Sequence, residues 1–161
     1  MTSVHPDILA ALTSGIQSEV ASYVFYLEAS KKSEANRIKD VLQKLAAEEK
    51  QHFQVLERQY DSLVRSEKWI STADILKQEG LPEISEEMSS THQALIDEVA
   101  ETDSLSAILD IAYRLEVKAR DLYTSSAGTA DSPEGKKVFE QLAKFEEGHM
   151  KIISEMKEKY A

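Results

Sequence analysis

Two segments of this chain carry the same set of potential metal-binding residues, and the second segment follows the first after 97 residues. In each copy a glutamate is followed 30 residues later by a Glu-x-x-His sequence. The six residues are Glu19, Glu49 and His52 in the first copy and Glu116, Glu146 and His149 in the second. One Glu from each of two helices plus a Glu-x-x-His from each of two others is the ligand set of a dinuclear metal site in a four-helix bundle.

The duplication extends beyond these six candidate ligands. At the same offset, Tyr26 corresponds to Tyr123. Apolar positions also correspond, namely Val41 with Val138, Leu45 with Leu142 and Ala46 with Ala143. Chance does not account for so many matches at one spacing, so we expect two near-equivalent halves of one site. The two tyrosines follow the first Glu of each copy by two helical turns, and we expect them either to fill the core or to hydrogen-bond to the ligands.

Each candidate ligand occupies a position where a helix would otherwise present an apolar residue to the core. Glu49 and His52 continue the stripe that contains Leu45 and Leu56, because residues three or four apart share one face of a helix. Buried carboxylates need compensating charge, and these stripes contain no lysine or arginine. Two divalent cations would neutralise four carboxylates. The mixture of imidazole and carboxylate favours iron or manganese, with zinc as a substitute.

Other residues near the pattern are interpreted as structural or solvated. We expect Glu48 and Glu147, which adjoin candidate ligands, to be solvated. His5 and His92 have no glutamate at ligand spacing and are predicted to lie on the surface. Trp69 is predicted to be a packing residue.

Helices must carry the candidate ligands, and apolar periodicity predicts four long ones in a single domain, residues 1–161. Their approximate bounds are 6–31, 34–64, 104–124 and 133–160. A connection as long as the crossover 65–103 seldom lacks structure of its own, and helical patterns occur in it at 72–79 and 85–101. The fold class predicted is all-α, a four-helix bundle of up-down pairs joined by one long crossover that contains short helices.

The predicted loops place the paired glutamates opposite each other. In an antiparallel helix pair with a tight loop, residues equidistant from the loop lie side by side. The midpoint between Glu19 and Glu49 is residue 34, next to the predicted break between the first two helices. The midpoint between Glu116 and Glu146 is residue 131, at the end of a small polar loop predicted at 125–131. Both glutamate pairs are therefore expected at the same height in their hairpins.

Composition excludes several classes of function. The chain contains no cysteine, which excludes disulfides and thiolate metal sites. Its net charge of −10 argues against binding to nucleic acid or to anionic membrane surfaces. No apolar run is long enough to span a bilayer, and no signal peptide is evident, so we expect a cytoplasmic protein.

The sequence around the candidate ligands resembles the rubrerythrin family of the ferritin-like superfamily. The similarity lies in Glu19–Tyr26, which reads EVASYVFY, and in Phe145–His149, which reads FEEGH. It covers the helices at 6–64 and 104–160 and implies a ferritin-like bundle that binds two iron ions. By position, the resemblance implies that Glu49 and Glu146 bridge the irons, that Glu19 and His52 hold one, and that Glu116 and His149 hold the other.

The resemblance also implies a function. Family members reduce hydrogen peroxide or dioxygen with electrons from a small redox protein, which suggests a diiron oxidoreductase in a cytoplasmic homodimer that counters oxidative stress. This chain has no cysteine for the rubredoxin-like iron of rubrerythrins proper, and Tyr113 and Ala119 flank Glu116 where the family has an extra glutamate. The plainer six-ligand site is shared with ferritins. The alternatives are therefore a ferroxidase that stores iron and a metal-binding bundle without catalytic turnover.

Overall fold

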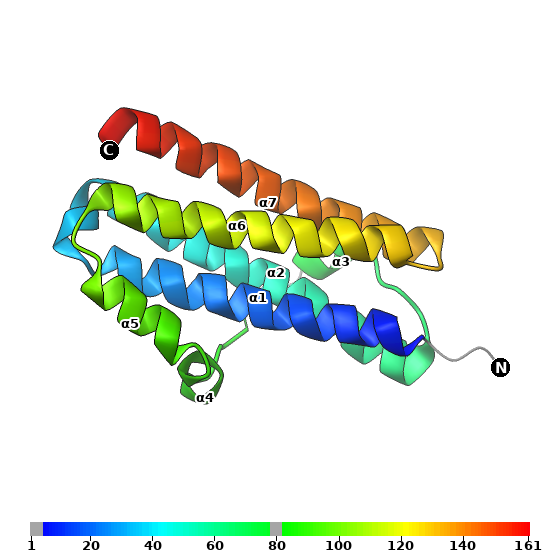
Figure 1. Ribbon diagram of the computed structural model, residues 1–161. Helices are drawn as coiled ribbons and strands as arrows, with labels where there is room; N and C mark the ends of the chain where they lie inside the picture. The colour runs from blue at the N-terminus through cyan, green and yellow to red at the C-terminus, as the bar shows by residue number, and fades with distance from the viewer. Residues whose placement is uncertain (1–4, 78–81) are drawn as a thin grey trace.

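The computed structural model describes residues 5–77 and 82–161. The four long helices are α1 (Pro6–Ser30), α2 (Lys39–Ser66), α6 (Leu105–Thr129) and α7 (Pro133–Tyr160). α1 and α2 form one antiparallel hairpin, α6 and α7 form a second, and the hairpins pack side by side (Figure 1). The described residues contain no strand, so the predicted all-α bundle is confirmed. None of the described helices is both long and apolar enough to cross a bilayer.

Side-chain caps determine where the helices of the second hairpin begin. The Ser104 hydroxyl accepts a hydrogen bond from the Ala107 N–H (3.1 Å), and the Ser132 hydroxyl accepts one from the Gly135 N–H (3.1 Å). Pro133 occupies the first turn of α7, where its missing N–H costs nothing. These caps satisfy backbone donors that no carbonyl within the helix can reach, and they fix the register of the two helices.

The turn between α1 and α2 differs from the prediction. α2 begins at Lys39 rather than at residue 34, because Ser33–Ile38 form the six-residue 3₁₀ helix η1. Ala35 and Ile38 are both buried. They share one side of η1, since residues three apart eclipse in a 3₁₀ helix. The tighter helix therefore lets the turn pack into the core.

α6 is longer than predicted, and the expectation of a loop over residues 125–131 is wrong. The helix continues to Thr129, and both Ser126 and Ala127 are buried in its last turns. The Ser126 hydroxyl donates to the Leu122 carbonyl (2.8 Å), which satisfies the polar side chain inside the helix. The connection to α7 is therefore only residues 130–132.

The described part of the crossover between α2 and α6 contains the short helices α3 (Thr72–Leu76), α4 (Glu86–Ser90) and α5 (Gln93–Glu101). It returns the chain from one end of the bundle to the other, with α4 and α5 beside α1 (Figure 1). The helix predicted at 72–79 ends at Leu76, and its last two predicted residues lie outside the described ones. The helix predicted at 85–101 is interrupted at Thr91 and His92, whose backbone N–H groups donate to carbonyls three residues back, those of Met88 (3.4 Å) and Ser89 (3.1 Å).

The start of the crossover is anchored to both hairpins. Trp69 packs edge-on against Phe139 of α7, with ring centroids 6.0 Å apart. Its ring also fills the space beside Gly135, where an added Cβ would lie 2.7 Å from it. On α2, the buried Gln59 amide donates to the Ile70 carbonyl (2.6 Å) and accepts from the Ile70 N–H (2.9 Å). Trp69 is therefore a packing residue, as predicted.

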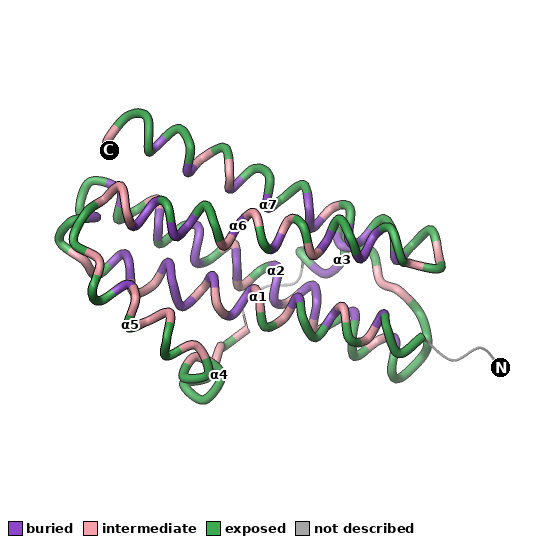
Figure 2. The backbone as a smooth tube through the Cα atoms, viewed as in Figure 1, coloured by how far each residue is buried: buried purple, intermediate pink, exposed green. Residues whose placement is uncertain are grey.

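Buried residues line the inward faces of the four long helices (Figure 2). They form two large apolar clusters, one toward each end of the bundle. Tyr26 belongs to the first cluster and Tyr123 to the second. The buried glutamates and histidines lie between these clusters, near the middle of the helices, so apolar packing encloses them from both ends.

Candidate metal centre

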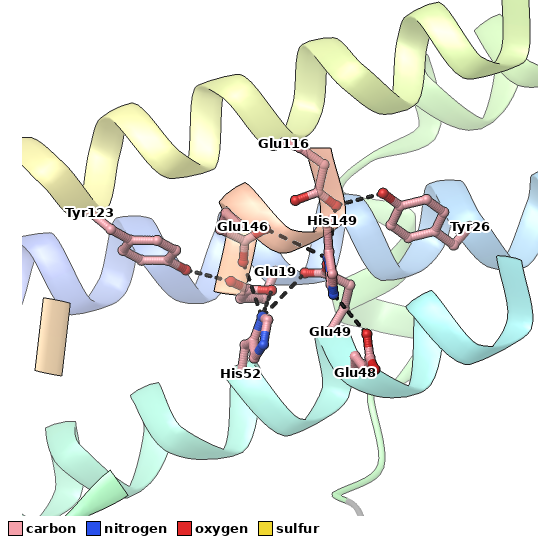
Figure 3. Close-up of polar contacts among 9 residues, drawn as sticks. All are labelled: Glu19, Tyr26, Glu48, Glu49, His52, Glu116, Tyr123, Glu146 and His149. Atoms are coloured by element: carbon pink, nitrogen blue, oxygen red, sulfur yellow. Dashed lines mark hydrogen bonds and ion pairs between the residues drawn. The ribbon is translucent and has the colours of Figure 1, made fainter. Parts of the chain in front are cut away.

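All six residues of the duplicated pattern lie together in the middle of the bundle (Figure 3). Glu19 comes from α1 and Glu116 from α6, while α2 and α7 each contribute one Glu-x-x-His pair. Each of the six residues is at most 4% exposed to solvent. A spacing of three residues brings both side chains of each pair to the inward face of its helix. The packing of two hairpins thus assembles one cluster from four helices.

The six side chains form two overlapping groups of candidate metal ligands. The first group consists of Glu19, Glu49, His52 and Glu146, and the second of Glu49, Glu116, Glu146 and His149. Within each group, one potential ligand atom from every residue lies within 4.8 Å of the others. Glu49 and Glu146 belong to both groups. A carboxylate from each hairpin is therefore placed to contact two metal positions.

The two halves of the cluster are related by an approximate two-fold exchange of the hairpins. His52 Nδ1 lies 3.0 Å from Glu146 Oε1. In the matching contact, His149 Nδ1 lies 2.8 Å from Glu49 Oε1. Each histidine therefore faces the shared glutamate of the other hairpin, and on both rings Nδ1 is the nitrogen that a metal would contact.

Tyr26 and Tyr123 hydrogen-bond to candidate ligands of the opposite hairpin. The Tyr26 hydroxyl donates to Glu116 Oε1 (2.5 Å), and the Tyr123 hydroxyl donates to Glu19 Oε1 (2.5 Å). Both tyrosines are fully buried. They therefore combine the two roles considered for them, because each ring fills the core while its hydroxyl fixes a carboxylate.

When all four glutamates are ionised, five carboxylate oxygens in the cluster have no aligned hydrogen-bond donor among the described residues. They are Glu19 Oε2, both oxygens of Glu49, Glu116 Oε2 and Glu146 Oε2. Burying so many unpartnered acceptors is costly unless cations bind them. No lysine or arginine is among the buried residues that the structure describes. Anionic oxygens beside two imidazole nitrogens suit divalent iron, manganese or zinc, so the residues present fit a pair of divalent metal ions.

Crowding raises the pKa of the two shared glutamates. Burial, together with the charges of neighbouring carboxylates, Glu146 foremost, raises the pKa of Glu49 well above its usual value of 4.5. Burial and the charges of Glu19 and Glu116 raise the pKa of Glu146 in the same way. Without a metal, the shared glutamates therefore retain protons at pH values where an exposed glutamate is ionised.

The two outer glutamates are shifted in the opposite direction. Burial opposes ionisation of Glu19, but hydrogen bonding with Glu49 and the nearby His52 imidazole together lower its pKa to about 2. Burial also opposes ionisation of Glu116, yet hydrogen bonds within the cluster, first with Glu146, lower its pKa below 4.5. In the metal-free cluster the outer glutamates are therefore the stronger acids and the shared glutamates the weaker ones.

Glu48 contacts the cluster, although the sequence indicated that it would be solvated. Its Oε2 accepts a hydrogen bond from His149 Nε2 (2.8 Å), on the ring edge opposite Nδ1 (Figure 3). This hydrogen bond is the main reason that the pKa of Glu48 is lowered. Burial alone would lower the pKa of His149, but hydrogen bonds to Glu116 and Glu48 raise it to about 9. In the sequence, the only signal for Glu48 is its place directly before Glu49.

A cavity of about 320 Å³ opens beside the cluster, between α2 and α7. Its lining includes Glu48, His52, Phe145 and His149, together with Leu76 of α3. The two imidazoles therefore border the cavity, whereas the described lining includes none of Glu19, Glu49, Glu116 and Glu146. The volume is ample for several small molecules, since one water molecule occupies about 30 Å³ in the liquid.

The remaining two histidines lie apart from the cluster. His5 is exposed, and its Nδ1 accepts a hydrogen bond from the Asp7 N–H (3.1 Å) at the start of α1. His92 was expected on the surface but is partly buried, and this burial lowers its pKa. Glu147 is exposed, as expected. None of these side chains belongs to either ligand group.

Replacing either buried tyrosine should destabilise the metal-free protein. Tyr123→Phe leaves Glu19 Oε1 without its donor. Tyr26→Phe removes one donor from Glu116 Oε1, which keeps its contact with His149 Nδ1 (3.2 Å). We expect Tyr123→Phe to lower the free energy of unfolding by about 1–3 kcal/mol, the usual cost of a buried polar group without a partner. Tyr26→Phe should lower it by about 0.5–1.5 kcal/mol, the usual net contribution of one hydrogen bond. Urea denaturation would measure the change. Tyr113→Phe, which changes an exposed ring, is the control and should lower the free energy of unfolding by less than about 0.5 kcal/mol. Equal losses of stability in all three variants would contradict this role of the buried hydroxyls.

Fold and cluster together define the class of protein, an up-down helical bundle with a long crossover and a buried, two-position candidate metal site of carboxylates and histidines. The sequence model of the Rubrerythrin family matches residues 10–103 and 107–161. The chain therefore belongs to the rubrerythrin family and has its ferritin-like helical bundle fold, which confirms the resemblance stated from the sequence. Comparisons with curated proteins and with solved structures found no match.

Proposed function

We propose that the protein is a non-haem diiron-carboxylate oxidoreductase that reduces hydrogen peroxide or dioxygen with electrons from a separate redox protein. The observation that carries this proposal is the pair of four-residue ligand groups that share Glu49 and Glu146. The two shared carboxylates would hold two metal ions next to each other in one cluster. A site for a single structural metal ion would need only one such group of ligands. Membership of the rubrerythrin family supports iron as the metal.

The proposal gives each ligand of the cluster a role. One iron would be held by Glu19 and His52, the other by Glu116 and His149, and both would be contacted by Glu49 and Glu146. The four carboxylates would balance the charge of two ferrous ions. When bound, the ferrous pair supplies the two electrons that, together with two protons, convert hydrogen peroxide into two molecules of water.

The protein's own residues would orient the ligands and control access. Tyr26 and Tyr123 hold the outer glutamates in place through the hydroxyls described above, so the ligands are arranged before a metal arrives. The cavity beside His52 offers a small oxidant an approach between α2 and α7. The apolar clusters toward the two ends of the bundle keep bulk water away from the glutamates.

The residues available for redox chemistry support a separate electron donor. The chain contains no cysteine, so it has no thiolate ligands for a rubredoxin-type or iron–sulfur centre. Steady turnover would therefore require a reduced rubredoxin-type protein or a flavin-linked donor to return two electrons in every catalytic cycle.

Stopped-flow mixing of anaerobically prepared, Fe(II)-loaded protein with hydrogen peroxide or with dioxygen tests the proposal. We expect ferric absorbance to develop in a single turnover that consumes one peroxide for every two irons, and then to stop. Adding a reduced rubredoxin-type donor should restore repeated turnover. Protein loaded with Zn(II) is the matched control, and it should not react because zinc has no accessible redox change.

Other results would point to one of the alternative functions. Fe(II) that stays unchanged after mixing with both oxidants would indicate a metal-binding bundle without turnover. Retention of many irons per chain, together with a large hollow shell in small-angle scattering, would indicate iron storage. Comparison of the rates with the two oxidants would identify the preferred substrate.

A further inference from the structure

The two halves of the cluster differ at the residue that precedes each shared glutamate. The six candidate ligands and the two tyrosines are identical between positions 97 residues apart. Glu48 precedes Glu49, whereas Phe145 precedes Glu146 at the equivalent position. Each of these side chains lies against the histidine of the opposite hairpin. The duplication is therefore incomplete at the outer edge of the site.

Glu48 and Phe145 contact their histidines in different ways. Glu48 accepts a hydrogen bond from His149 Nε2 (2.8 Å), which fixes that ring with Nδ1 directed at the candidate ligands Glu49 and Glu116 (Figure 3). The Phe145 ring instead stacks on His52, with centroids 5.0 Å apart and an interplanar angle of 13°. No hydrogen bond joins His52 Nε2 to a described residue.

Neighbouring polar residues do not give His52 a comparable partner. Gln51 and Lys144 also line the cavity, but the described structure has no hydrogen bond between either of them and His52. Glu147, on the other side of the shared glutamate of α7, is exposed. The difference between the two histidines therefore rests on Glu48 and Phe145.

We propose that Glu48 is a positioning residue that makes the two metal positions unequal, so that the position containing His149 binds metal more tightly than the one containing His52. A carboxylate behind a ligand histidine orients the ring and increases its basicity, and losing such a partner weakens metal binding by about 10–100-fold. The stacked Phe145 restrains its histidine without offering Nε2–H an acceptor. This inference rests on the two-metal site proposed above and adds an order in which the positions fill and empty.

Titration of the metal-free full chain with Co(II), followed by d–d absorbance and calorimetry, would resolve the two positions. We expect two binding steps per chain, with dissociation constants about 10–100-fold apart. Glu48→Gln, which keeps the size of the side chain but removes its charge, should weaken the tighter step and bring the two constants together. Glu147→Gln is the matched control, because it removes the same charge at an exposed position beside the other shared glutamate. It should leave both steps unchanged.

Single-histidine variants identify the position that Glu48 serves. The His52→Ala variant keeps only the metal position that contains His149 fully equipped with ligands. Adding Glu48→Gln to this variant should weaken Co(II) binding by about 10–100-fold. In His149→Ala, the same addition should change the affinity by no more than about 2-fold, the usual limit for independent sites. Phe145→Glu is the reciprocal change and should strengthen the weaker step of the otherwise unaltered protein, because it offers His52 Nε2 a carboxylate.

The possible failures are distinguishable. Equal weakening by Glu48→Gln in both histidine variants, or weakening in neither, would overturn the inference while leaving the metal site intact. Absence of Co(II) binding by the unaltered protein would overturn the two-metal site and this inference with it. The titration involves no oxidant, so its result is independent of whether the protein reduces peroxide.

Discussion

Loading the metal-free protein with Fe(II) or Mn(II) should raise its melting temperature, and the increase should grow between about pH 5 and about pH 8. At a hundredfold excess of free metal over Kd, each occupied position adds about 2.7 kcal/mol of stability. For a domain of this size, that corresponds to about 5–10 °C for each position. Anaerobic differential scanning calorimetry with and without metal would measure the shift.

The pH dependence follows from three raised pKa values. Burial and neighbouring carboxylates raise the pKa of Glu49 and Glu146 above 4.5, and that of His149 is about 9 rather than 6.5. Groups whose pKa rises on folding stabilise the fold below their ordinary pKa, and they lose this contribution as the pH rises through the folded value. The metal-free protein should therefore become less stable from about pH 5 upwards, whereas a metal that displaces these protons binds more tightly.

Two lowered pKa values set the acid limit of stability. The pKa of Glu116 is lowered and that of Glu19 is about 2, so both groups stabilise the fold above 4.5 and lose this contribution as the pH falls. The metal-free protein should accordingly be most stable near about pH 5. If metal does not raise the melting temperature, or raises it equally at about pH 5 and about pH 8, a site built from these carboxylates would be contradicted.

Glu49→Gln should abolish two-metal binding and at the same time stabilise the metal-free protein. Glu49 belongs to both ligand groups, so its replacement affects both metal positions. We expect the affinity for metal to fall by more than about 100-fold. Removing a residue that only hydrogen-bonds to a ligand costs about 10–100-fold, and the loss of a ligand should cost more. In the metal-free protein, the same change removes a buried acid surrounded by carboxylates and retains its volume. The expected gain is about 0.5–2 kcal/mol, as is common when a functional group is removed from a buried site.

Iron analysis after loading and desalting, together with urea denaturation near about pH 8 where the effect of metal is greatest, would measure both effects. The unaltered protein should retain two irons per chain and the Glu49→Gln variant at most one. Glu147→Gln, which removes the same charge at an exposed site, should change neither quantity. Retention of two irons by the Glu49→Gln variant would exclude a shared role for this glutamate. A loss of stability in its metal-free form would mean that the carboxylate serves packing.

The cluster could be located from sequence because two independent spacings constrain it. The three-residue spacing places Glu49 and His52 on one helix face, and the 30-residue spacing brings Glu19 opposite Glu49 across a turn near residue 34. The second hairpin kept its register although α6 extends to Thr129. Its shorter connection, residues 130–132, still has residue 131 at its centre.

The features that the sequence did not reveal depend on distant packing. The serines near the end of α6 favour loops in isolation, whereas in the bundle Ser126 is buried and its hydroxyl is bonded to the Leu122 carbonyl of the same helix. The contact between Glu48 and His149 joins residues 101 apart in the chain. It depends on how closely α2 approaches α7, a distance set by the packing of both hairpins, which no local pattern reports.

The hydrogen bonds of the two tyrosines also imply an order of events during folding. Tyr26 and Glu116 are 90 residues apart in the chain, and Tyr123 and Glu19 are 104 apart, whereas each hairpin is built from nearer neighbours. The entropy of closing long loops makes such distant contacts form after local ones. We therefore expect the metal centre to be completed only when the two hairpins dock, after the contacts within each hairpin have formed. A metal bound there would act mainly on the rate of unfolding, and so would lengthen the lifetime of the folded chain without hastening its formation.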